Sequence, residues 1–147
     1  VQLKKGFCVI DFGVKYQGYC SDITRTVFIG KPTEKEKGVY NDVLDVQKTC
    51  VKMCVGGQKC SVVYDYALEM LGEWFTHGLG HGIGVEIHEW PNLKPKGKEK
   101  FEDGMIFTVE PGVYTKKYGI RIEDDVLIEN GKPKVLTPIS KAFRIVK

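Results

Sequence analysis

All three histidines of the 147-residue chain lie in one glycine-rich stretch, His77-Gly-Leu-Gly-His81-Gly-Ile-Gly-Val-Glu-Ile-His88. Its four glycines alternate between residues 78 and 84, and each disfavours a helix because glycine costs a helix interior about 1 kcal/mol relative to alanine. Glycine also lets the backbone turn tightly and approach a ligand. Because imidazole suits both proton transfer and metal binding near neutral pH, the stretch indicates an active-site segment.

Apolar, β-prone runs lie on both sides of the histidine stretch. Those before it end at Gly30-Lys31-Pro32, which breaks the sheet pattern, and those after it begin beyond Gly104. Residues 91–103, which lie between, hold two prolines and many charges and predict a surface loop. We expect strands at residues 7–11, 14–20, 23–29, 105–110, 120–128 and near Val135.

Two helices are predicted between the first strands and the histidines. Thr33 and Glu36 have the spacing of a capping box, and apolar residues at three- and four-residue steps then predict a helix that ends at Gly56. Ser61 is the expected cap of a second helix, which stops near Gly72. The order of elements predicts an α+β fold, with the helices on one face of an antiparallel sheet.

Four acidic residues lie within or at the end of apolar strand runs, where an isolated carboxylate is expensive to bury. Two divalent ions would neutralise four carboxylates, and one imidazole would complete an oxygen-rich shell that suits manganese, cobalt, iron or zinc. A pair of such ions activates water and polarises the bond to be broken, so the residues indicate metal-dependent hydrolysis. The four acidic residues are Asp11, Asp22, Glu110 and Glu123.

Composition argues against several other classes of protein. The net charge is only +3, and basic residues are interleaved with acidic ones, as at 35–37 and 98–100, so no basic stripe favours nucleic-acid binding. No apolar run approaches the roughly 18–20 residues of a membrane span. The five cysteines are odd in number and form no CxxC pair, which favours free, buried thiols in a reducing cytoplasm. The length fits one domain over residues 1–147.

Five short motifs follow one another along the chain: Asp11-Phe-Gly, Ser21-Asp22-Ile-Thr-Arg-Thr26, His77-Gly-Leu-Gly-His81-Gly-Ile-Gly, Glu110-Pro-Gly and Arg121-Ile-Glu123-Asp-Asp. Together they resemble the metallopeptidase family of the pita-bread fold, which contains methionine aminopeptidase, aminopeptidase P and prolidase. The resemblance covers essentially the whole chain in the family's order. The sequence around the histidines is closer to that of the proline-specific branch than to that of methionine aminopeptidase.

The resemblance implies a centre of two divalent metal ions, with manganese or cobalt favoured and zinc or iron possible. It implies that Asp22 and Glu123 bridge the ions, that a bridging water is the nucleophile, and that Glu110 also acts as the general base. The five metal ligands implied by the resemblance are Asp11, Asp22, His81, Glu110 and Glu123.

The resemblance also implies roles for the two remaining histidines and a substrate. His88 would stabilise the tetrahedral intermediate in the manner of an oxyanion hole, and His77 would line the site and help to bind intermediate or product. The substrate would be an Xaa-Pro dipeptide or a peptide with proline second, cut on the amino side of proline. Asn92 stands where prolidase-like members often have an arginine suited to a substrate carboxylate, which leaves open the preference for dipeptides over longer peptides.

By the same resemblance, residues 1–147 form the carboxy-terminal portion of the catalytic domain, without most of the first half-repeat of the fold. The connection near Gly72 is several residues shorter than is usual in the family. Such a portion exposes one face of its sheet and some helix-packing surface. We therefore expect a cytoplasmic homodimer, with neither nucleic acid nor membrane as a partner.

Three alternatives stay open. One is a methionine aminopeptidase, which a methionyl peptide would reveal. Another is a peptide-binding module that keeps the fold without catalysis, although relatives of that kind lose ligands that this chain retains. A third is metal-free, creatinase-like cleavage of a carbon–nitrogen bond, which the retained ligand set also disfavours.

Overall fold

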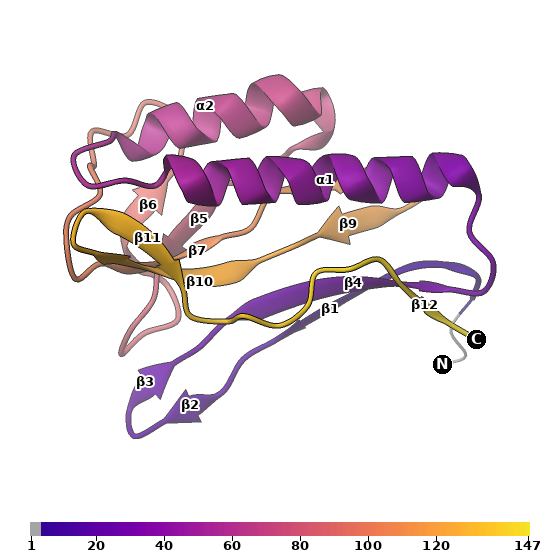
Figure 1. The fold of residues 1–147 in the computed structure, drawn as a ribbon, viewed down its shortest axis with the longest axis horizontal. Coiled ribbons are helices and arrows are strands. Elements are labelled where there is room, and N and C mark those ends of the chain that lie inside the picture. Colours follow the sequence, from indigo (N-terminus) through magenta and orange to yellow (C-terminus); the bar gives the residue numbers. More distant parts are fainter. Residues whose placement is uncertain (1–3) are drawn as a thin grey trace.

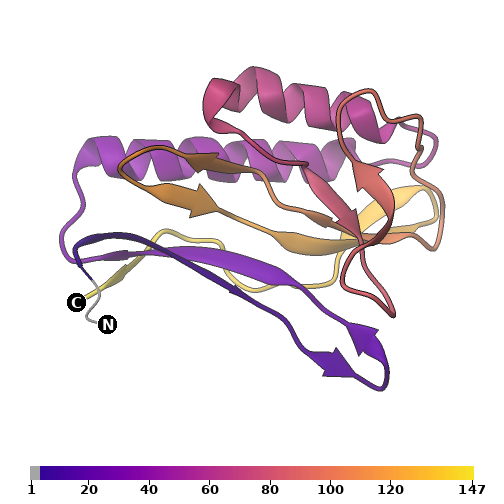
Figure 2. The ribbon, with the colours of Figure 1, turned by 180° about the vertical axis from the view of Figure 1, so that it is seen from behind.

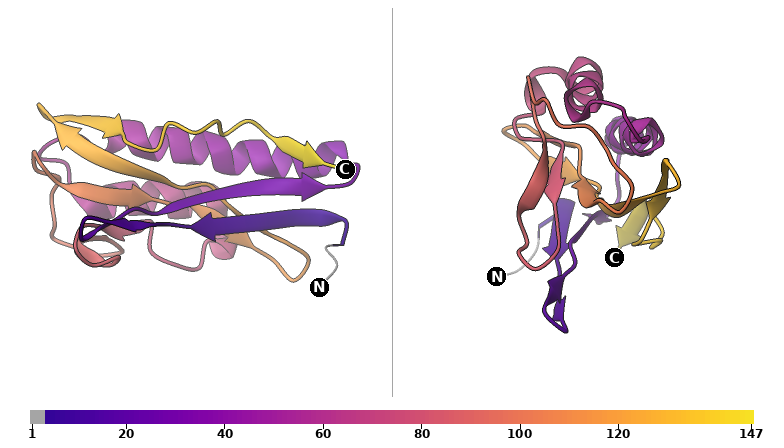
Figure 3. Two further views of the ribbon diagram at one scale, coloured as in Figure 1. Left: turned by 90° about the horizontal axis from the view of Figure 1, so that it is seen from below. Right: turned by 90° about the vertical axis from the view of Figure 1, so that its left-hand side faces the viewer.

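Two helices cover one side of a curved layer of β-strands in the computed structural model, which describes residues 4–147 (Figure 1). Seen end-on, the helices form one layer and the strands another, and a narrow hairpin extends away from the helices (Figure 3). The arrangement is the predicted one, an α+β fold with both helices on the same face. Within the described residues, no helix has the length and apolar character needed to cross a membrane.

The first sheet has three strands. β1 (Gly6–Phe12) pairs with β4 (Ile23–Ile29) in antiparallel register along its whole length, from Gly6 opposite Ile29 to Phe12 opposite Ile23. The third strand, β12 (Arg144–Val146), lies parallel to β4 on its other side. β12 was not predicted, and antiparallel pairing was expected throughout, because a three-residue strand has too few positions to show an alternating pattern.

A hairpin connects β1 to β4 where one extended run was predicted over residues 14–20. Its strands are β2 (Lys15–Tyr16) and β3 (Tyr19–Cys20), joined through Gln17 and Gly18, which both have positive φ. The hairpin extends beyond the rest of the molecule, as the view from behind shows (Figure 2). Apolar side chains of β1 and this hairpin are exposed, in agreement with the expected open sheet face: Ile10, Phe12, Val14, Tyr16 and Tyr19.

The second sheet has five strands in the order β11-β10-β7-β5-β6. A separate two-stranded ladder continues the curved layer toward the first sheet. The sheet strands are β5 (Gly80–Gly82), β6 (Glu89–Leu93), β7 (Ile106–Val109), β10 (Asp124–Glu129) and β11 (Lys132–Val135), and the ladder strands are β8 (Gly112–Tyr114) and β9 (Gly119–Arg121).

Two predictions in this region, one of a loop and one of a strand, were wrong in part. The predicted loop at 91–103 begins inside β6, where Leu93 is fully buried against the core. The single strand predicted over 120–128 breaks at Ile122 and Glu123, which separate β9 from β10. The break arises because the Glu123 N–H leaves the sheet pattern and donates to the Thr24 carbonyl oxygen on β4, at 3.1 Å. Glu123 therefore sits at the junction between the two sheets.

Helix α1 (Glu34–Met53) begins at the predicted capping box. The Thr33 Oγ1 accepts from the Glu36 N–H at 3.2 Å, and the Glu36 carboxylate accepts from the Thr33 N–H at 2.6 Å. The predicted apolar stripe is buried, with Val43 and Cys50 fully covered. Helix α2 (Cys60–Leu71) begins two residues earlier than predicted: Lys59 is its N-cap and Ser61 lies within the first turn. A short 3₁₀ turn, η1 (Gly72–Trp74), follows α2.

All five cysteines are free thiols, as predicted, but Cys8 and Cys20 are only partly buried. Cys50, Cys54 and Cys60 are buried in the core between the helices and the sheet. Burial raises the pKa of the Cys50 thiol to about 12, so this group stays protonated and behaves as a small apolar side chain.

Asp124 is fully buried and connects the helical layer to both sheets. Its carboxylate accepts from Gln47 of α1 at 2.9 Å and pairs with Arg25 of β4 at 2.7 Å. Lys141 and Thr137, in the segment that leads to β12, also donate to it. The cluster fixes the start of β10, which adjoins Glu123.

We expect Thr33→Ala to lower the free energy of unfolding by about 1 kcal/mol, because it removes a cap that satisfies an otherwise free N–H of α1. Chemical denaturation monitored by circular dichroism measures the change. Thr49→Ala, a partly exposed position inside the same helix, is the matched control and should stay within about 0.5 kcal/mol of the wild type. Equal effects of the two substitutions would contradict a specific role for the cap.

Candidate functional site

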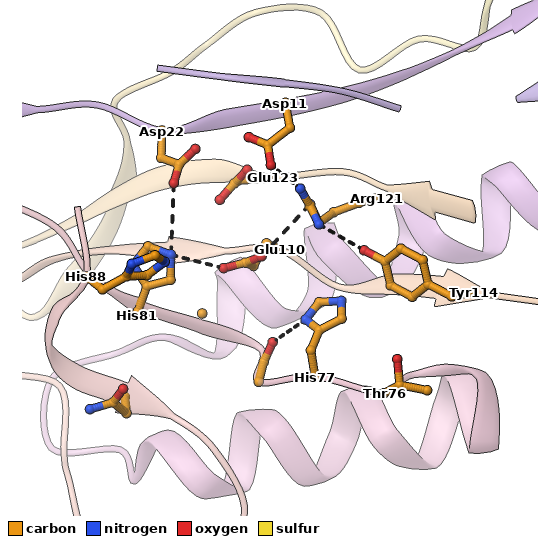
Figure 4. Close-up of a pocket in the computed structure, with 13 residues that line it drawn as sticks. Asp11, Asp22, Thr76, His77, His81, His88, Glu110, Tyr114, Arg121 and Glu123 are labelled. Atoms are coloured by element: carbon orange, nitrogen blue, oxygen red, sulfur yellow. Dashed lines mark hydrogen bonds and ion pairs between the residues drawn. The ribbon is translucent and has the colours of Figure 1, made fainter. Parts of the chain in front are cut away.

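A cavity of about 580 Å³ opens where the two sheets meet. Its walls come from strands of both sheets, so residues far apart in the sequence face one another across it (Figure 4). Every site residue predicted from the sequence lines it: Asp11 on β1, Asp22 before β4, His77 and His81 around β5, His88 before β6, Glu110 after β7, and Glu123 between β9 and β10.

His81 lies at the centre of the site. Its Nε2 is 3.3 Å from the nearer Glu110 oxygen and 3.9 Å from the nearer Asp22 oxygen. Its Nδ1 lies 3.1 Å from the Gly82 carbonyl oxygen. Since a carbonyl oxygen only accepts, Nδ1 carries the proton, and Nε2 faces the carboxylates either protonated or with its lone pair free for a cation. This orientation, with the outer ring nitrogen fixed by a carbonyl, is typical of metal-binding histidines.

Three of the predicted ligands lie within reach of one cation. Asp22, His81 and Glu123 each offer a donor atom within 4.8 Å of the donors of the other two. Oxygen atoms and one imidazole nitrogen suit divalent transition ions. On this donor set, the residues fit a metal centre.

The charges in the site indicate the same need for a cation. Glu123 is 2% exposed; burial, followed by the charges of Glu110 and Asp22, raises its pKa to about 8. Burial and the charge of Asp11 raise the pKa of Asp22. Carboxylates placed so close together in a buried site repel one another, and a divalent cation would offset that repulsion.

The contact between His81 and Glu110 changes the pKa of both groups. Burial alone would lower the pKa of His81, but its hydrogen bonds to Glu110 and Gly82 and the nearby carboxylate charges raise it. Burial, the largest single effect, raises the pKa of Glu110, but the hydrogen bond and charge of His81, together with the Thr108 hydroxyl and the charge of His77, outweigh burial and lower that pKa. Glu110 is therefore ionised near neutral pH, beside a ring that can hold a positive charge.

Asp11 stands apart from the other carboxylates. Its side chain is 49% exposed and forms an ion pair with Arg121. The same guanidinium donates from Nε to the Thr24 hydroxyl at 3.0 Å and from another nitrogen to the Tyr114 hydroxyl at 3.1 Å. Arg121 and Tyr114 also line the cavity, although no role was predicted for either. Arg121 had a signal like that of Glu123, because it is a charge between Ile120 and Ile122 in an apolar strand run.

The two other histidines also line the cavity, each against different neighbours. His88 is exposed on the loop before β6, and its ring centroid lies 4.3 Å from that of His81. His77 packs its ring against Phe75 and Tyr114, each with centroids 5.2 Å away. Its Nδ1 bonds the Gly78 carbonyl at 2.7 Å, and among the described residues its Nε2 has no hydrogen-bond partner.

The glycines of the histidine stretch serve strand packing. A Cβ at Gly80 would lie 1.9 Å from the Thr108 carbonyl oxygen on β7, and one at Gly82 would lie 2.1 Å from the Trp90 carbonyl oxygen on β6. Both glycines are buried, so β5 fits between its neighbours only without side chains there. Gly80 also lines the cavity, so the close packing of β5 lies directly beside the site. Asn92 lies opposite His81 on β6 and lines the cavity.

The chain belongs to metallopeptidase family M24, whose model matches residues 2–130. It is 43% identical over 135 residues to an Xaa-Pro dipeptidase of Pyrococcus furiosus, a match that covers 88% of this chain and 39% of the relative. The resemblance inferred from the motifs is therefore confirmed.

Solved structures agree with this assignment. A prolidase from Thermococcus sibiricus matches 99% of this chain with a TM-score of 0.95 and 40% identity, over 42% of its own length. An X-Pro aminopeptidase from Thermotoga maritima matches 98% of the chain with a TM-score of 0.92 and 38% identity, over 43% of its length. The pita-bread fold is confirmed, and the chain spans about two fifths of the length of these relatives.

In the metal-free protein, kept so by a chelator, we expect Glu123→Gln to reduce the loss of stability at alkaline pH. The folded pKa of Glu123, about 8, exceeds the ordinary value of 4.5, so the folded state holds this proton more tightly than the unfolded chain does. The stability linked to the proton is complete below about pH 4.5 and is lost as the pH rises through about 8. Between about pH 5 and 9 the variant should lose roughly 2–4 kcal/mol less than the wild type.

Denaturant titrations at a series of pH values measure this difference. Glu129→Gln is the control. Glu129 is an exposed carboxylate at the end of β10, the strand that begins directly after Glu123, so the profile of this variant should match that of the wild type. Parallel profiles for Glu123→Gln and the wild type would show that Glu123 does not titrate as its surroundings indicate.

Proposed function

We propose that residues 1–147 form the carboxy-terminal portion of the catalytic domain of a dinuclear-metal exopeptidase. The enzyme hydrolyses the peptide bond before proline, in Xaa-Pro dipeptides or at peptide amino termini. The observation that carries the proposal is the position of the His81 Nε2, which faces the Asp22 and Glu110 carboxylates in a cavity of suitable size. The Xaa-Pro dipeptidase and prolidase names of the relatives support the substrate class.

Two divalent ions are the proposed cofactors, manganese or cobalt in preference to zinc or iron. When bound, such ions lower the pKa of a water molecule and polarise the scissile carbonyl. Four carboxylates would neutralise the charge of two divalent ions, and the single imidazole would make the ligands of the two ions unequal. Asp22 and Glu123 are the proposed bridging ligands. The full set would be Asp11, Asp22, His81, Glu110 and Glu123.

Glu110 is the proposed general base. The hydrogen bond and charge of His81, with the Thr108 hydroxyl, lower its pKa and keep it ionised near neutral pH. The Thr108 hydroxyl donates to one of its oxygens at 3.0 Å, and the other oxygen lies 3.9 Å from the Arg121 Nε. A carboxylate fixed in this way can accept a proton from the attacking water. It can then return the proton to the prolyl nitrogen, which lacks an amide hydrogen and must be protonated as it leaves.

His88 and His77 are proposed to contact the substrate from opposite sides. His88 is exposed beside His81, where its ring can donate to the oxygen of the tetrahedral intermediate. His77 has its Nδ1 committed to Gly78 and its Nε2 unpartnered among the described residues. That nitrogen suits a role in holding intermediate or product.

We also propose that the protein is a cytoplasmic homodimer without nucleic-acid or membrane partners. The exposed apolar residues of β1 and the β2–β3 hairpin support a protein contact on this side. The free thiols of all five cysteines are typical of a reducing compartment.

The purified protein should release proline from an Xaa-Pro dipeptide only when manganese or cobalt is supplied. Glu110→Gln should lower kcat by at least about 100-fold, since it removes the proton acceptor. A colorimetric assay for free proline measures both effects. Glu69→Gln, an exposed position on α2, is the matched control and should retain full activity.

Other outcomes would favour other functions. Cleavage of a methionyl peptide in place of the prolyl substrate would indicate a methionine aminopeptidase. Bound metal with no turnover of either peptide would indicate that the metal centre is intact but that the substrate groove is missing. Absence of both metal binding and turnover would contradict the catalytic proposal and favour a peptide-binding module.

A further inference from the structure

Two short segments from opposite halves of the sequence each carry a proposed bridging ligand and, two residues later, a buried polar side chain. The first is Asp22 and Thr24 at the start of β4, and the second is Glu123 and Asp125 at the start of β10. Thr24 is fully buried and Asp125 is 5% exposed. Neither polar side chain faces solvent, so each must find its partners inside the protein.

The partner of Thr24 is the ligand on the other segment. Its hydroxyl lies 2.5 Å from the Glu123 Oε2, and it accepts from the Arg121 Nε at 3.0 Å. With the guanidinium donating to it, the hydroxyl directs its own proton to the carboxylate. A second bond, from the Glu123 N–H to the Thr24 carbonyl at 3.1 Å, fixes the backbone of the same ligand. Both the backbone and the side chain of Glu123 are therefore held by Thr24.

Asp125 makes the reciprocal contact. Its Oδ2 accepts from the Asp22 N–H at 3.1 Å, and its own N–H donates to the Thr137 hydroxyl at 3.0 Å. Its Oδ1 is buried and has no partner within the part of the chain that the structure describes. Burial raises the pKa of this carboxyl to about 6. A buried acid is costly to keep, and a hydrogen bond to the backbone of a proposed ligand gives it a specific use.

We propose that Thr24 and Asp125 are positioning residues: Thr24 holds the carboxylate of Glu123, and Asp125 holds the backbone of Asp22, so each supports the proposed bridging ligand on the other's segment. We call the two contacts, Thr24–Glu123 and Asp125–Asp22, the crossed pair. Because each segment supports the ligand of the other, a displacement of either strand moves both carboxylates. The crossed pair thus sets the separation and direction of the two groups that must address the same two cations. This inference rests on the proposed dinuclear centre and extends it to residues that touch no ion.

Thr26 offers a matched comparison on the same face of β4. It is 2% exposed, and its hydroxyl accepts from the Arg121 N–H and donates to the Arg121 carbonyl, at 3.1 and 2.8 Å. It therefore joins the same two segments as Thr24 but bonds only to backbone and reaches no carboxylate. A substitution at Thr26 reports the cost of losing a buried hydroxyl between the strands, without the loss of a contact to a proposed ligand.

The test is a manganese titration of the purified protein, with free Mn²⁺ measured by electron paramagnetic resonance. The wild type should bind two ions. Thr24→Val, which keeps the shape of the side chain and removes the hydroxyl, should lower the affinity for at least one of the two ions about 10–100-fold. Thr24→Ser should restore wild-type binding, and Thr26→Val should bind as the wild type does.

The other half of the crossed pair is tested by two substitutions of Asp125. Asp125→Asn keeps an oxygen that can accept from Asp22 and should retain both ions, whereas Asp125→Ala should weaken binding. Denaturation curves of all variants confirm that each is folded at the temperature of the titration. If Thr24→Val and Asp125→Ala bind manganese no more weakly than Thr26→Val, the crossed pair has no positioning role.

Failure of the proposed function gives a different pattern. A wild type that binds manganese but releases no proline contradicts the peptidase, while the binding data for the variants still decide the crossed pair. A wild type that binds no manganese overturns the dinuclear centre and the crossed pair with it.

Discussion

The mutual repulsion of the carboxylates around His81 is the physical constraint on which this fold depends. Asp22, Glu110 and Glu123 come from three different strand ends and lie in a partly buried cavity, where their charges oppose one another. Such an arrangement is unfavourable for a metal-free chain and can persist only if the surrounding structure holds it. Several features meet this demand: the break between β9 and β10, the glycines that let β5 fit between β6 and β7, and the buried anchor at Asp124.

Much of the site could be predicted from the sequence because its chemistry violates the local pattern. A charge inside an apolar strand, or three imidazoles in one short stretch, has no simple structural explanation, so Glu123 and His81 stood out. The fold class followed from the order of strands and helices. Family motifs then supplied roles that spacing alone leaves open, and the structure places all of these residues around one cavity.

The parts that escaped prediction have ordinary sequences. Thr24 and Thr108 look like any threonine in a strand, since β-branched residues are favoured there for their shape. Only the structure reveals that their hydroxyls reach Glu123 and Glu110. The parallel strand β12 is too short to have a pattern, and the fold of the β2–β3 hairpin depends on two positive φ values at Gln17 and Gly18. Contacts between distant residues, unlike unusual residues, leave little trace in one sequence.

The long separation in sequence between contacting residues has a consequence for biosynthesis. Thr24 and Glu123 are 99 residues apart, and Asp22 and Asp125 are 103 apart. A ribosome that has made β1, β4 and both helices has made one wall of the cavity and none of the groups that complete it. A nascent chain at that stage cannot capture metal ions from the cell with the affinity of the finished centre. Full metal affinity would therefore wait for the synthesis of Glu123 and Asp125, so that the proposed chemistry appears only once its support is in place.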